Sequence, residues 1–371
     1  MKILIIGSNG FIAKNLIIFL KNIPNISIFK IKSKNDNQKL FRILPEVDTV
    51  FHLAGVNRGS KKNDFFRNNF LLTKKICNFI IKRKIHLNFF YTSTVLTNQK
   101  SFYGLTKKDA EDCVLNLKKK TNCPVFVYKL PNVFGKGCKP FYNSVVATFC
   151  HQLTRDKKVT IENPKKILNF LYIDDLIDSF GKNLLVRKKL KTKLVTLPRT
   201  YKVSISNLYK ILCNFKSNGV FSPQYYQKGL LKKLFATYVS YMPLFKTKSF
   251  VNGFKDSRGS FYEILKSKIS GQVSFLCILP GQTRGDHYHN TKVELFFLVS
   301  GKVKINTKNI FNKKKTSFIL RGGEKIPSTI TQPGHAHNIV NIGKDEAKFI
   351  IWSNEIFNMK KPDTHVYKII K

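Results

Sequence analysis

A tyrosine and a lysine at helical spacing, Tyr103 and Lys107, are the residues of this chain best suited to acid–base chemistry. Residues four apart lie on one face of a helix, so the lysine ammonium can lie beside the phenol and lower its pKa from the usual ~10. We therefore expect Tyr103 to exchange a proton with a substrate oxygen near neutral pH, and Thr94 to hold the reacting carbonyl through its hydroxyl. Because the chain is rich in lysine, the pair alone is a weak signal, and the features before it decide its meaning.

The N-terminus predicts a site for a dinucleotide. Residues 3–6 are a continuous apolar run, typical of a buried parallel strand, and they lead directly into Gly7-Ser8-Asn9-Gly10-Phe11-Ile12-Ala13 and a helical segment, residues 14–22. Glycines at positions 7 and 10 allow a tight turn whose backbone amides can approach a pyrophosphate, and Ala13 leaves room for contact between helix and strand. The cofactor contacts expected from this turn are Gly7, Asn9, Gly10, Phe11 and Ile12.

The second predicted strand, residues 26–31, ends at Lys32-Ser33-Lys34. A site that prefers NAD usually places a carboxylate there for the ribose 2′-hydroxyl, whereas cations suit a 2′-phosphate. Lys32 therefore favours NADPH, although a lysine at any surface position is unsurprising in so basic a chain.

Two further strands are expected to end beside the cofactor. Residues 47–53 lead to Ala54-Gly55, and residues 87–91 deliver Thr92-Ser93-Thr94 at the carboxyl edge, where open parallel sheets gather their ligands. His52 is expected to be packed or hydrogen-bonded rather than catalytic. Asn69, in the helix that follows, is expected to brace the active-site strand.

The order of these features resembles the extended short-chain dehydrogenases/reductases: a glycine-rich turn, His-Leu-Ala-Gly, a hydroxyl cluster, then the tyrosine and lysine. The resemblance implies a catalytic set of Thr94, Tyr103 and Lys107, with threonine where serine is usual and Ser93 as a second candidate for that role. Residues 130–135 resemble the family's loop over the nicotinamide, where the sugar-nucleotide site begins. Further cofactor contacts expected are Lys32, Leu53, Ala54, Gly55, Asn69, Tyr103, Lys107, Leu130, Asn132 and Val133, and the expected substrate contacts are Ser93, Asn132, Asn143 and Ser144.

A late pair of acids, Asp174-Asp175, resembles the pair that opens a helix in the same enzymes. Carboxylates at a helix start are also favoured by the helix dipole, so the pair has a purely structural interpretation, which we prefer.

From about residue 250 the strand–helix alternation gives way to short strands punctuated by Gly, Pro and Asn, which predicts an all-β barrel or sandwich. His287 and His289 are two apart on a strand, so both rings point to one face, and Glu294 can join them from a neighbouring turn or strand. Residues 333–338 can supply a fourth ligand from a facing strand. Three imidazoles and one carboxylate suit zinc, iron or manganese.

These spacings resemble the cupin signature, fully in its first motif and less well around Gln332-Pro333. The resemblance implies that His337, rather than His335, completes the ligand set, with zinc as the expected metal. The fold class expected is an α/β Rossmann-type doubly wound parallel sheet, residues 1–245, followed by an all-β cupin barrel, residues 246–371.

Composition excludes some classes of protein. With 43% hydrophobic and 13% aromatic residues the chain is neither disordered nor fibrous. Its formal charge of +45 could attract nucleic acid or anionic membranes, but the lysines are spread singly along the chain, which favours a solvated basic surface and no specific nucleic-acid partner. Seven scattered cysteines and the lack of a long apolar run indicate a reducing cytoplasm and no membrane insertion.

A reductase followed by a cupin resembles, from end to end, the bifunctional enzymes of capsular polysaccharide synthesis. That resemblance implies a homodimer with a UDP-sugar substrate. The cupin half would epimerise C3 of a 4-keto UDP-6-deoxy sugar, and the reductase half would reduce C4 with NADPH. The product would be UDP-N-acetyl-L-talosamine, on the route to UDP-N-acetyl-L-fucosamine.

Two alternatives stay open. One is an enzyme of this architecture that acts on another nucleotide sugar, such as a dTDP sugar. The other is a non-catalytic NADPH-binding protein that uses its charge to hold nucleic acid, although such a protein need keep neither the Tyr103/Lys107 pair nor the cupin ligands.

Overall fold

The computed structural model describes residues 1–32, 36–57, 62–185, 193–217, 229–267 and 270–369. Contacts divide the chain into two compact units, the first comprising residues 1–217 and 229–243 and the second including residues 244–371. Each unit is described by itself below.

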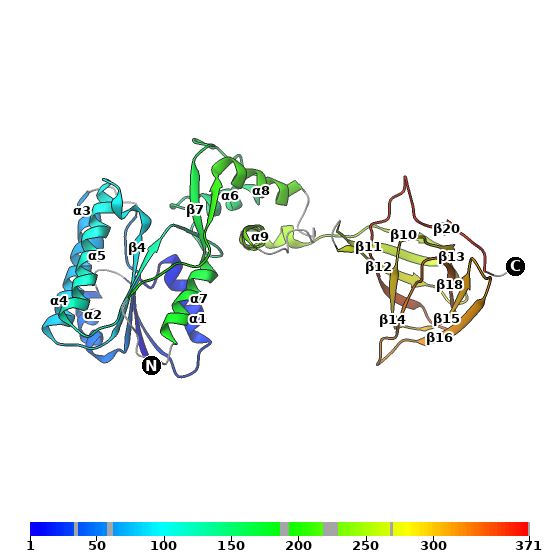
Figure 1. Ribbon diagram of the computed structural model, residues 1–371, viewed down its shortest axis with the longest axis horizontal. Helices are drawn as coiled ribbons and strands as arrows, with labels where there is room; N and C mark the ends of the chain where they lie inside the picture. Colours follow the sequence, from blue (N-terminus) through cyan, green and yellow to red (C-terminus); the bar gives the residue numbers. More distant parts are fainter. Residues whose placement is uncertain (33–35, 58–61, 186–192, 218–228, 268–269, 370–371) are drawn as a thin grey trace. The chain divides into compact units, whose positions relative to one another are not determined.

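A six-stranded parallel sheet forms the centre of the first unit (Figure 1). Its strands, in spatial order, are β2 (Ser27–Ile31), β1 (Lys2–Ile6), β3 (Thr49–His52), β4 (Asn88–Thr94), β5 (Val125–Leu130) and β8 (Lys193–Leu194). The chain leaves β1 first towards β2 and later towards β3, so the sheet has its topological switch point between β1 and β3. Open α/β sheets bind ligands in the crevice at that point.

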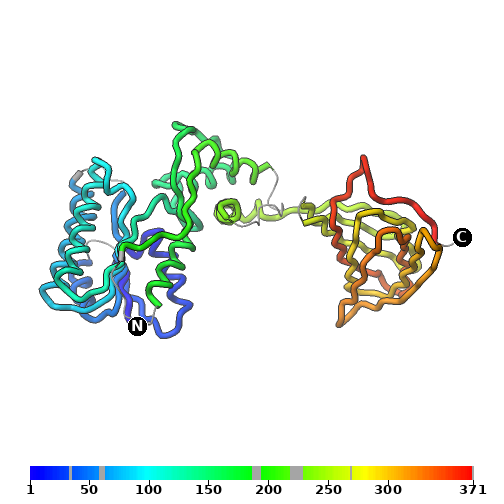
Figure 2. The backbone as a smooth tube through the Cα atoms, viewed as in Figure 1, coloured from blue at the N-terminus to red at the C-terminus, as the bar shows by residue number. Residues whose placement is uncertain are grey.

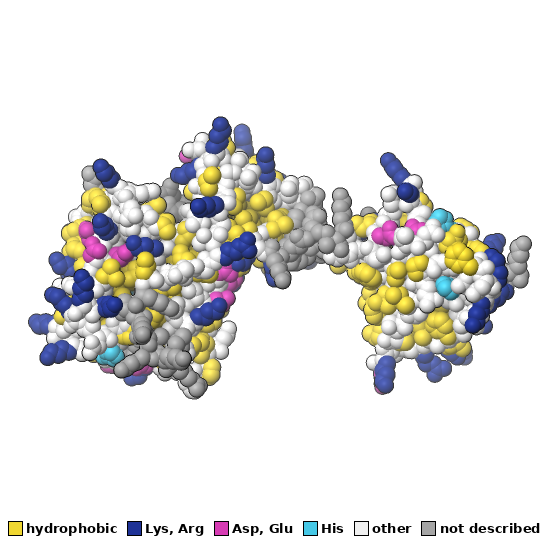
Figure 3. All heavy atoms as spheres, viewed as in Figure 1, with side chains coloured by type: hydrophobic (Ala, Val, Ile, Leu, Met, Phe, Trp, Pro, Cys, Tyr) yellow, Lys and Arg dark blue, Asp and Glu magenta, His cyan; other side chains and the backbone are white. Residues whose placement is uncertain are grey.

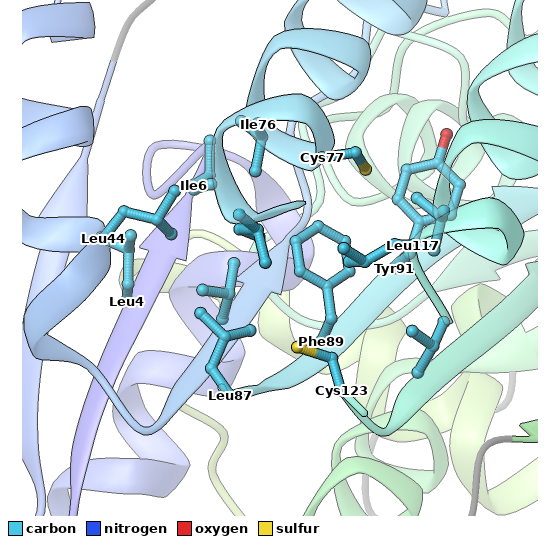
Figure 4. Packing of buried hydrophobic residues seen from close by; sticks show 14 of the residues in the cluster. Leu4, Ile6, Leu44, Ile76, Cys77, Leu87, Phe89, Tyr91, Leu117 and Cys123 are labelled. Atoms are coloured by element: carbon cyan, nitrogen blue, oxygen red, sulfur yellow. The ribbon is translucent and has the colours of Figure 1, made fainter. Parts of the chain in front are cut away.

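Helices cover both faces of this sheet. On one face lie α2 (Asn37–Ile43), α4 (Leu72–Lys82) and α5 (Phe102–Lys120), whose side chains share one core with those of the strands. Figure 4 shows Ile76 and Cys77 of α4 and Leu117 of α5 in this core, with Phe89 and Tyr91 of β4. On the other face lie α1 (Phe11–Lys21) and α7 (Ile173–Leu184), which are far apart in sequence but side by side in space (Figure 2).

The apolar run of β1 follows from this two-sided cover. Ile3 and Ile5 enter the core beneath α1 and α7, whereas Leu4 and Ile6 enter the core beneath α2 and α4. All four side chains are at most 1% exposed. A strand buried on both faces has no position for a polar residue, which is why this strand does not alternate.

The rest of the first unit extends the sheet's carboxyl edge. A three-stranded sheet joins β6 (Asn132–Phe134), β7 (Ile167–Tyr172) and β9 (Tyr201–Ser204). The helices packed near it are α6 (Val145–Leu153), α8 (Ile205–Ser217) and α9 (Leu230–Ser240). The shorter helical segments of the unit are η2 (Leu44–Glu46), α3 (Lys62–Phe65), the π-helical η3 (Phe66–Leu71) and η4 (Val95–Asn98).

Among its described residues, the second unit has one short helix, η6 (Leu244–Thr247), followed by antiparallel strands in two sheets. One sheet has the order β10 (Gly253–Asp256), β11 (Gly259–Ser267), β12 (Gly271–Ile278), β19 (Ala347–Ser353), β14 (Glu294–Ser300) and β17 (Ser328–Ile330). The other has the order β16 (Lys315–Arg321), β15 (Lys302–Asn309), β18 (His335–Asn341), β13 (Thr283–Tyr288) and β20 (His365–Val366). Apolar residues of both sheets, from β12, β14, β15, β18 and β19, share one core.

Lysine and arginine side chains are dispersed over the face of the first unit seen in Figure 3, whereas those of the second unit lie mainly along the edges of its face. Within the described ranges, none of the helices combines the length and apolar character that crossing a bilayer would require.

Candidate active site and metal cluster

The three predicted catalytic residues meet at the carboxyl end of β4. Helix α5 follows soon after this strand in the chain. It begins at Phe102 because the Ser101 hydroxyl caps the helix, accepting a hydrogen bond from the Gly104 amide at 3.1 Å. The phenol of Tyr103, in the first turn of α5, is hydrogen-bonded to the Thr94 hydroxyl. One turn further on, the buried Lys107 Nζ donates to the Thr92 carbonyl at 2.7 Å.

The electrostatics of this site differ from expectation in one respect. Burial raises the pKa of Tyr103, and the hydrogen bond from Thr94 opposes that shift only in part. The expected lowering by Lys107 was wrong, since spacing along a helix sets the direction of a side chain but not how deeply it is buried. A raised pKa keeps the phenol protonated, and this is the form that can deliver a proton to a carbonyl being reduced.

Ser93, the alternative to Thr94, has its hydroxyl engaged elsewhere. Ser93 Oγ donates to Glu111 Oε2 at 2.7 Å, and Glu111 Oε1 lies 2.9 Å from Lys129 Nζ. Of the two hydroxyl groups, it is that of Thr94 that contacts the phenol.

A cavity of about 230 Å³ lies at the switch point of the sheet, between the β1–α1 turn and the end of β3. Seven of the residues expected to contact the cofactor line it: Gly7, Asn9, Gly10, Lys32, Leu53, Ala54 and Gly55. Gly7 has φ +86°, and a Cβ there would lie 2.7 Å from the Ala54 backbone. Glycine is therefore required for this close approach of turn and strand, and the cradle that results fits the pyrophosphate of a dinucleotide. Ser33 and Lys34 lie outside the described residues.

The cavity leads towards the catalytic pair. A Cβ placed on Gly55, in the cavity wall, would lie 3.7 Å from Lys107 Nζ. Sequence reasoning missed the other seven lining residues, which are Ile6, Ile31, Asn37, Leu40, Val56, Asn68 and Leu72. Their positions at or after the ends of β1, β2 and β3, at the carboxyl edge of the sheet, were the signal that could have found them.

Other expected contacts lie outside this lining. Phe11, Ile12, Leu130 and Val133 pack against the core beneath α1 and α7. Asn69 is buried, and its side-chain amide pairs with both the amide and the carbonyl of Val56, at 2.8 and 2.9 Å. Asn69 thus braces the segment after β3. The expectation that it braces strand β4 was wrong.

The proposed substrate contacts after β5 have mainly structural partners. Asn132 Nδ2 donates to the Asn169 carbonyl at 3.2 Å, and the Ser144 hydroxyl caps α6 by accepting from the Ala147 amide at 3.2 Å. Asn143 is exposed, with φ +54°.

His52 is packed, as expected. It is fully buried, its Nε2 lies 2.9 Å from Thr73 Oγ1, and burial lowers its pKa to about 3, with a further contribution from Lys107. Asp174 and Asp175 lie in the first turn of α7 and pair with Lys136 and Lys233, in keeping with their structural interpretation.

In the second unit, the four predicted metal ligands come together. Their ligand atoms, from His287, His289, Glu294 and His337, all lie within 4.8 Å of one another. His287 pairs directly with His337 across β13 and β18, while Glu294 begins β14 of the other sheet. Such a set of three imidazoles and one carboxylate fits a divalent transition metal. His335 instead lies 3.0 Å from Asn309 Nδ2 through its Nε2 and does not belong to the cluster.

The protonation states of the cluster residues suit the binding of a metal. Burial lowers the pKa of His337 to about 4, so its imidazole is neutral at pH 7. Burial alone would raise the pKa of Glu294, but the contact with His289 Nε2, 3.3 Å from its carboxylate, and the charge of Lys292 bring it below its usual range. Neutral imidazoles and an ionised carboxylate are the forms that bind metals.

The C-terminal segment contacts the His/Glu cluster and the loop next to it through Asp363. The Asp363 carbonyl accepts a hydrogen bond from His289 Nδ1, which leaves Nε2 facing Glu294. The Asp363 carboxylate accepts hydrogen bonds from the backbone amides of Asn290, Thr291 and Lys292, at 2.7 to 3.1 Å.

A cavity of about 430 Å³, lined by His337 and by polar groups from β15, β16 and β18, opens beside the cluster.

Comparison with known proteins identifies the family. The model of the NAD-dependent epimerase/dehydratase family matches residues 3–184, and that of the polysaccharide biosynthesis C-terminal domain matches residues 254–365. A UDP-2-acetamido-2,6-β-L-arabino-hexul-4-ose reductase of Pseudomonas aeruginosa is 35% identical over 370 residues, which cover 100% of this chain and 99% of the relative. This chain belongs to the same family.

Solved structures agree with that assignment. The capsular polysaccharide assembling protein CapF of Staphylococcus aureus superposes with a TM-score of 0.90 and 30% identity, covering 99% of this chain and 100% of CapF. A UDP-glucuronic acid 4-epimerase of Bacillus cereus, with a TM-score of 0.57 and 20% identity over 67% of this chain, shares the fold of the first unit. The predicted fold class and the predicted resemblance are confirmed, and this member of the CapF-like nucleotide-sugar reductases is an enzyme.

Proposed function

We propose that this enzyme uses NADPH to reduce C4 of a UDP-2-acetamido-2,6-dideoxy-L-hexos-4-ulose. We further propose that its second unit, a cupin, epimerises C3, so that the product is UDP-N-acetyl-L-talosamine on the route to UDP-N-acetyl-L-fucosamine. The observation that carries the proposal is the cluster of Thr94, Tyr103 and Lys107 in a chain that aligns over its whole length with a reductase of this substrate class.

The reduction uses groups already in place. When bound, NADPH supplies the hydride that reaches C4. Thr94 holds the C4 oxygen, and Tyr103 gives its proton to that oxygen as negative charge develops there. Lys107, one turn along α5, orients the phenol and the nicotinamide ribose. Lys32, in the wall of the cofactor cavity, supports the choice of NADPH because its ammonium can pair with a 2′-phosphate.

The epimerisation is assigned to the His/Glu cluster of the second unit. A proton on C3 is acidified by the neighbouring 4-keto group; a base removes it, and a solvent-derived proton returns to the opposite face of C3. A divalent metal, zinc in our proposal, would supply charge stabilisation while C3 is deprotonated. His287, His289, Glu294 and His337 would hold the metal, and the adjoining cavity of about 430 Å³ is large enough for a sugar ring.

Two further expectations are part of the proposal. We infer that residues 1–245 act as the reductase domain and residues 246–371 as the metal-dependent one. We also infer that the enzyme works as a homodimer in the cytoplasm, on a small-molecule substrate rather than on nucleic acid.

A second candidate substrate is a dTDP-4-keto-6-deoxy sugar. A dTDP-D-glucose 4,6-dehydratase of Dictyostelium discoideum is 26% identical to this chain over 271 residues, although these cover only 57% of it. The greater coverage of the UDP-sugar reductase favours the UDP sugar.

The experiment is to follow NADPH oxidation by the purified full chain with each 4-keto sugar nucleotide in turn. We expect turnover with the UDP-linked sugar and a lower kcat/KM with the dTDP-linked sugar. The reverse order would establish the second candidate, and no oxidation with either sugar would contradict the proposed reductase function.

A further inference from the structure

Glu111 is a buried carboxylate that the proposed reaction does not use. It follows Tyr103 and Lys107 at further four-residue spacing on α5, so the three side chains share one face of the helix. Its side chain is 10% exposed, with Ser93 Oγ 2.7 Å from Oε2 and Lys129 Nζ 2.9 Å from Oε1. Because burying a carboxylate is costly even when it is paired, its position beside the catalytic pair calls for an explanation.

The contacts of Glu111 fasten the end of strand β4. Ser93 stands between Thr92, whose carbonyl accepts from Lys107, and Thr94, whose hydroxyl contacts the phenol. Ser93 is also the register partner of Lys129 on β5. One carboxylate therefore ties α5 to both strands at the point where the catalytic groups meet.

We propose that Glu111 is a positioning residue of the reductase site, holding Ser93 so that the end of β4 meets the catalytic pair on α5, and supporting the Lys107 ammonium by its charge. This inference rests on the proposed reductase function. It assigns to Glu111 no contact with substrate or cofactor.

The groups that face Lys107 set the sign of the effect. They are His52 from β3, Tyr91 from β4 and Glu111 from α5. Burial lowers the pKa of Lys107 to about 7, and Glu111 opposes that shift. The ammonium is therefore lost as pH rises through this value. Without the carboxylate, its loss begins at a lower pH.

The test compares pH profiles of kcat/KM for the wild type, Glu111→Gln and Asp112→Asn. Glutamine keeps an acceptor for Ser93 but removes the charge, so we expect its alkaline limb to move down by about one pH unit. Asp112 is an exposed carboxylate next along the same helix, and its variant should superimpose on the wild type. Coincidence of the Glu111→Gln and wild-type profiles would overturn the electrostatic role.

Ser93→Ala tests the positioning role while it leaves the charge in place. We expect kcat to fall about threefold to tenfold, as for loss of one neutral hydrogen bond, without a shift of the alkaline limb. An unchanged kcat would overturn this role. If Glu111→Gln fails to fold, Ser93→Ala still tests the inference.

A wild type that turns over no sugar would contradict the proposed function and not this inference. In that case the dissociation constant of NADPH, measured by its fluorescence over the same pH range, replaces kcat/KM. Binding to Glu111→Gln should weaken at lower pH than binding to the wild type, and coincident curves would overturn the inference.

Discussion

Tyr103 has its phenol in the protonated form that a proton donor requires. Burial raises the pKa of this phenol, which lies against the Thr94 hydroxyl. A reductase needs this form, because hydride transfer to a carbonyl leaves charge on the oxygen.

Replacing Tyr103 with phenylalanine removes only the phenol oxygen. We expect kcat to fall by about 10²–10⁴-fold, the usual contribution of a positioned general acid, while the NADPH dissociation constant stays within about twofold. Steady-state kinetics and a fluorescence titration measure the two quantities. Unchanged turnover would show that Tyr103 is not the acid.

Lys32 lies in the cofactor cavity at the end of β2. Lys32→Asp should change the ratio of kcat/KM for NADPH over NADH by about 10–100-fold towards NADH, because a carboxylate repels a 2′-phosphate and accepts from a 2′-hydroxyl. Lys30→Asp is the matched control, since Lys30 is an exposed residue of the same strand and is not in the cavity lining. An unaltered ratio in Lys32→Asp would mean that other residues bind the 2′-phosphate.

Among the elements, the β1–α1 turn depends most directly on a single residue type. Gly7→Ala would place a Cβ 2.7 Å from the Ala54 backbone at φ +86°, so we expect a loss of about 1–3 kcal/mol in unfolding free energy and weaker NADPH binding. Gly137 has a similar φ of +81° but no atom within 4 Å of its Cβ position. Gly137→Ala therefore carries the backbone strain alone. If both variants bound NADPH equally well, the close approach of turn and strand would not matter for binding.

The C-terminal segment should govern the metal affinity of the second unit. Asp363→Ala leaves three backbone amides of the loop before Glu294 without their acceptor. We expect zinc affinity to fall by about 10–100-fold, measured by competition with a chelator, because supporting residues orient the ligands. Asp345→Ala, on an exposed turn of the same unit, should leave the affinity unchanged. Equal affinities of the two variants would contradict this role of Asp363.

Whether a feature could be predicted from the sequence depends on whether its interactions are local or join distant parts of the chain. The glycine turn and the strand that carries Thr94 are local patterns, and each was predicted correctly as a structural feature. The side chains of His287 and His289 converge as predicted, but β13 ends at Tyr288, so His289 lies just beyond the strand. The partners of Asn69 and Ser93, and the burial of Tyr103, depend on how distant elements pack, and local spacing does not contain that information. The fourth member of the His/Glu cluster required a strand about 40 residues beyond Glu294, and only the family resemblance pointed to His337 rather than His335.

For the molecule as a whole, two chemistries are proposed on one chain, and each has its own group of residues. The first unit holds Thr94, Tyr103 and Lys107 near a cavity at the switch point of its sheet, and the second holds a His/Glu cluster beside a cavity of its own. An isolated 4-keto sugar can be reduced without epimerisation, so the coupling of the two reactions has to be read from the product.

The most direct measurement is the reaction of NADPH with the 4-keto UDP sugar in deuterated water, with the product analysed by mass spectrometry and NMR. We predict NADPH oxidation with one solvent deuteron at C3, since epimerisation exchanges that proton before C4 is reduced. A reduced product without deuterium at C3 would contradict epimerisation by the second unit, and the absence of NADPH oxidation would contradict the proposed function as a whole.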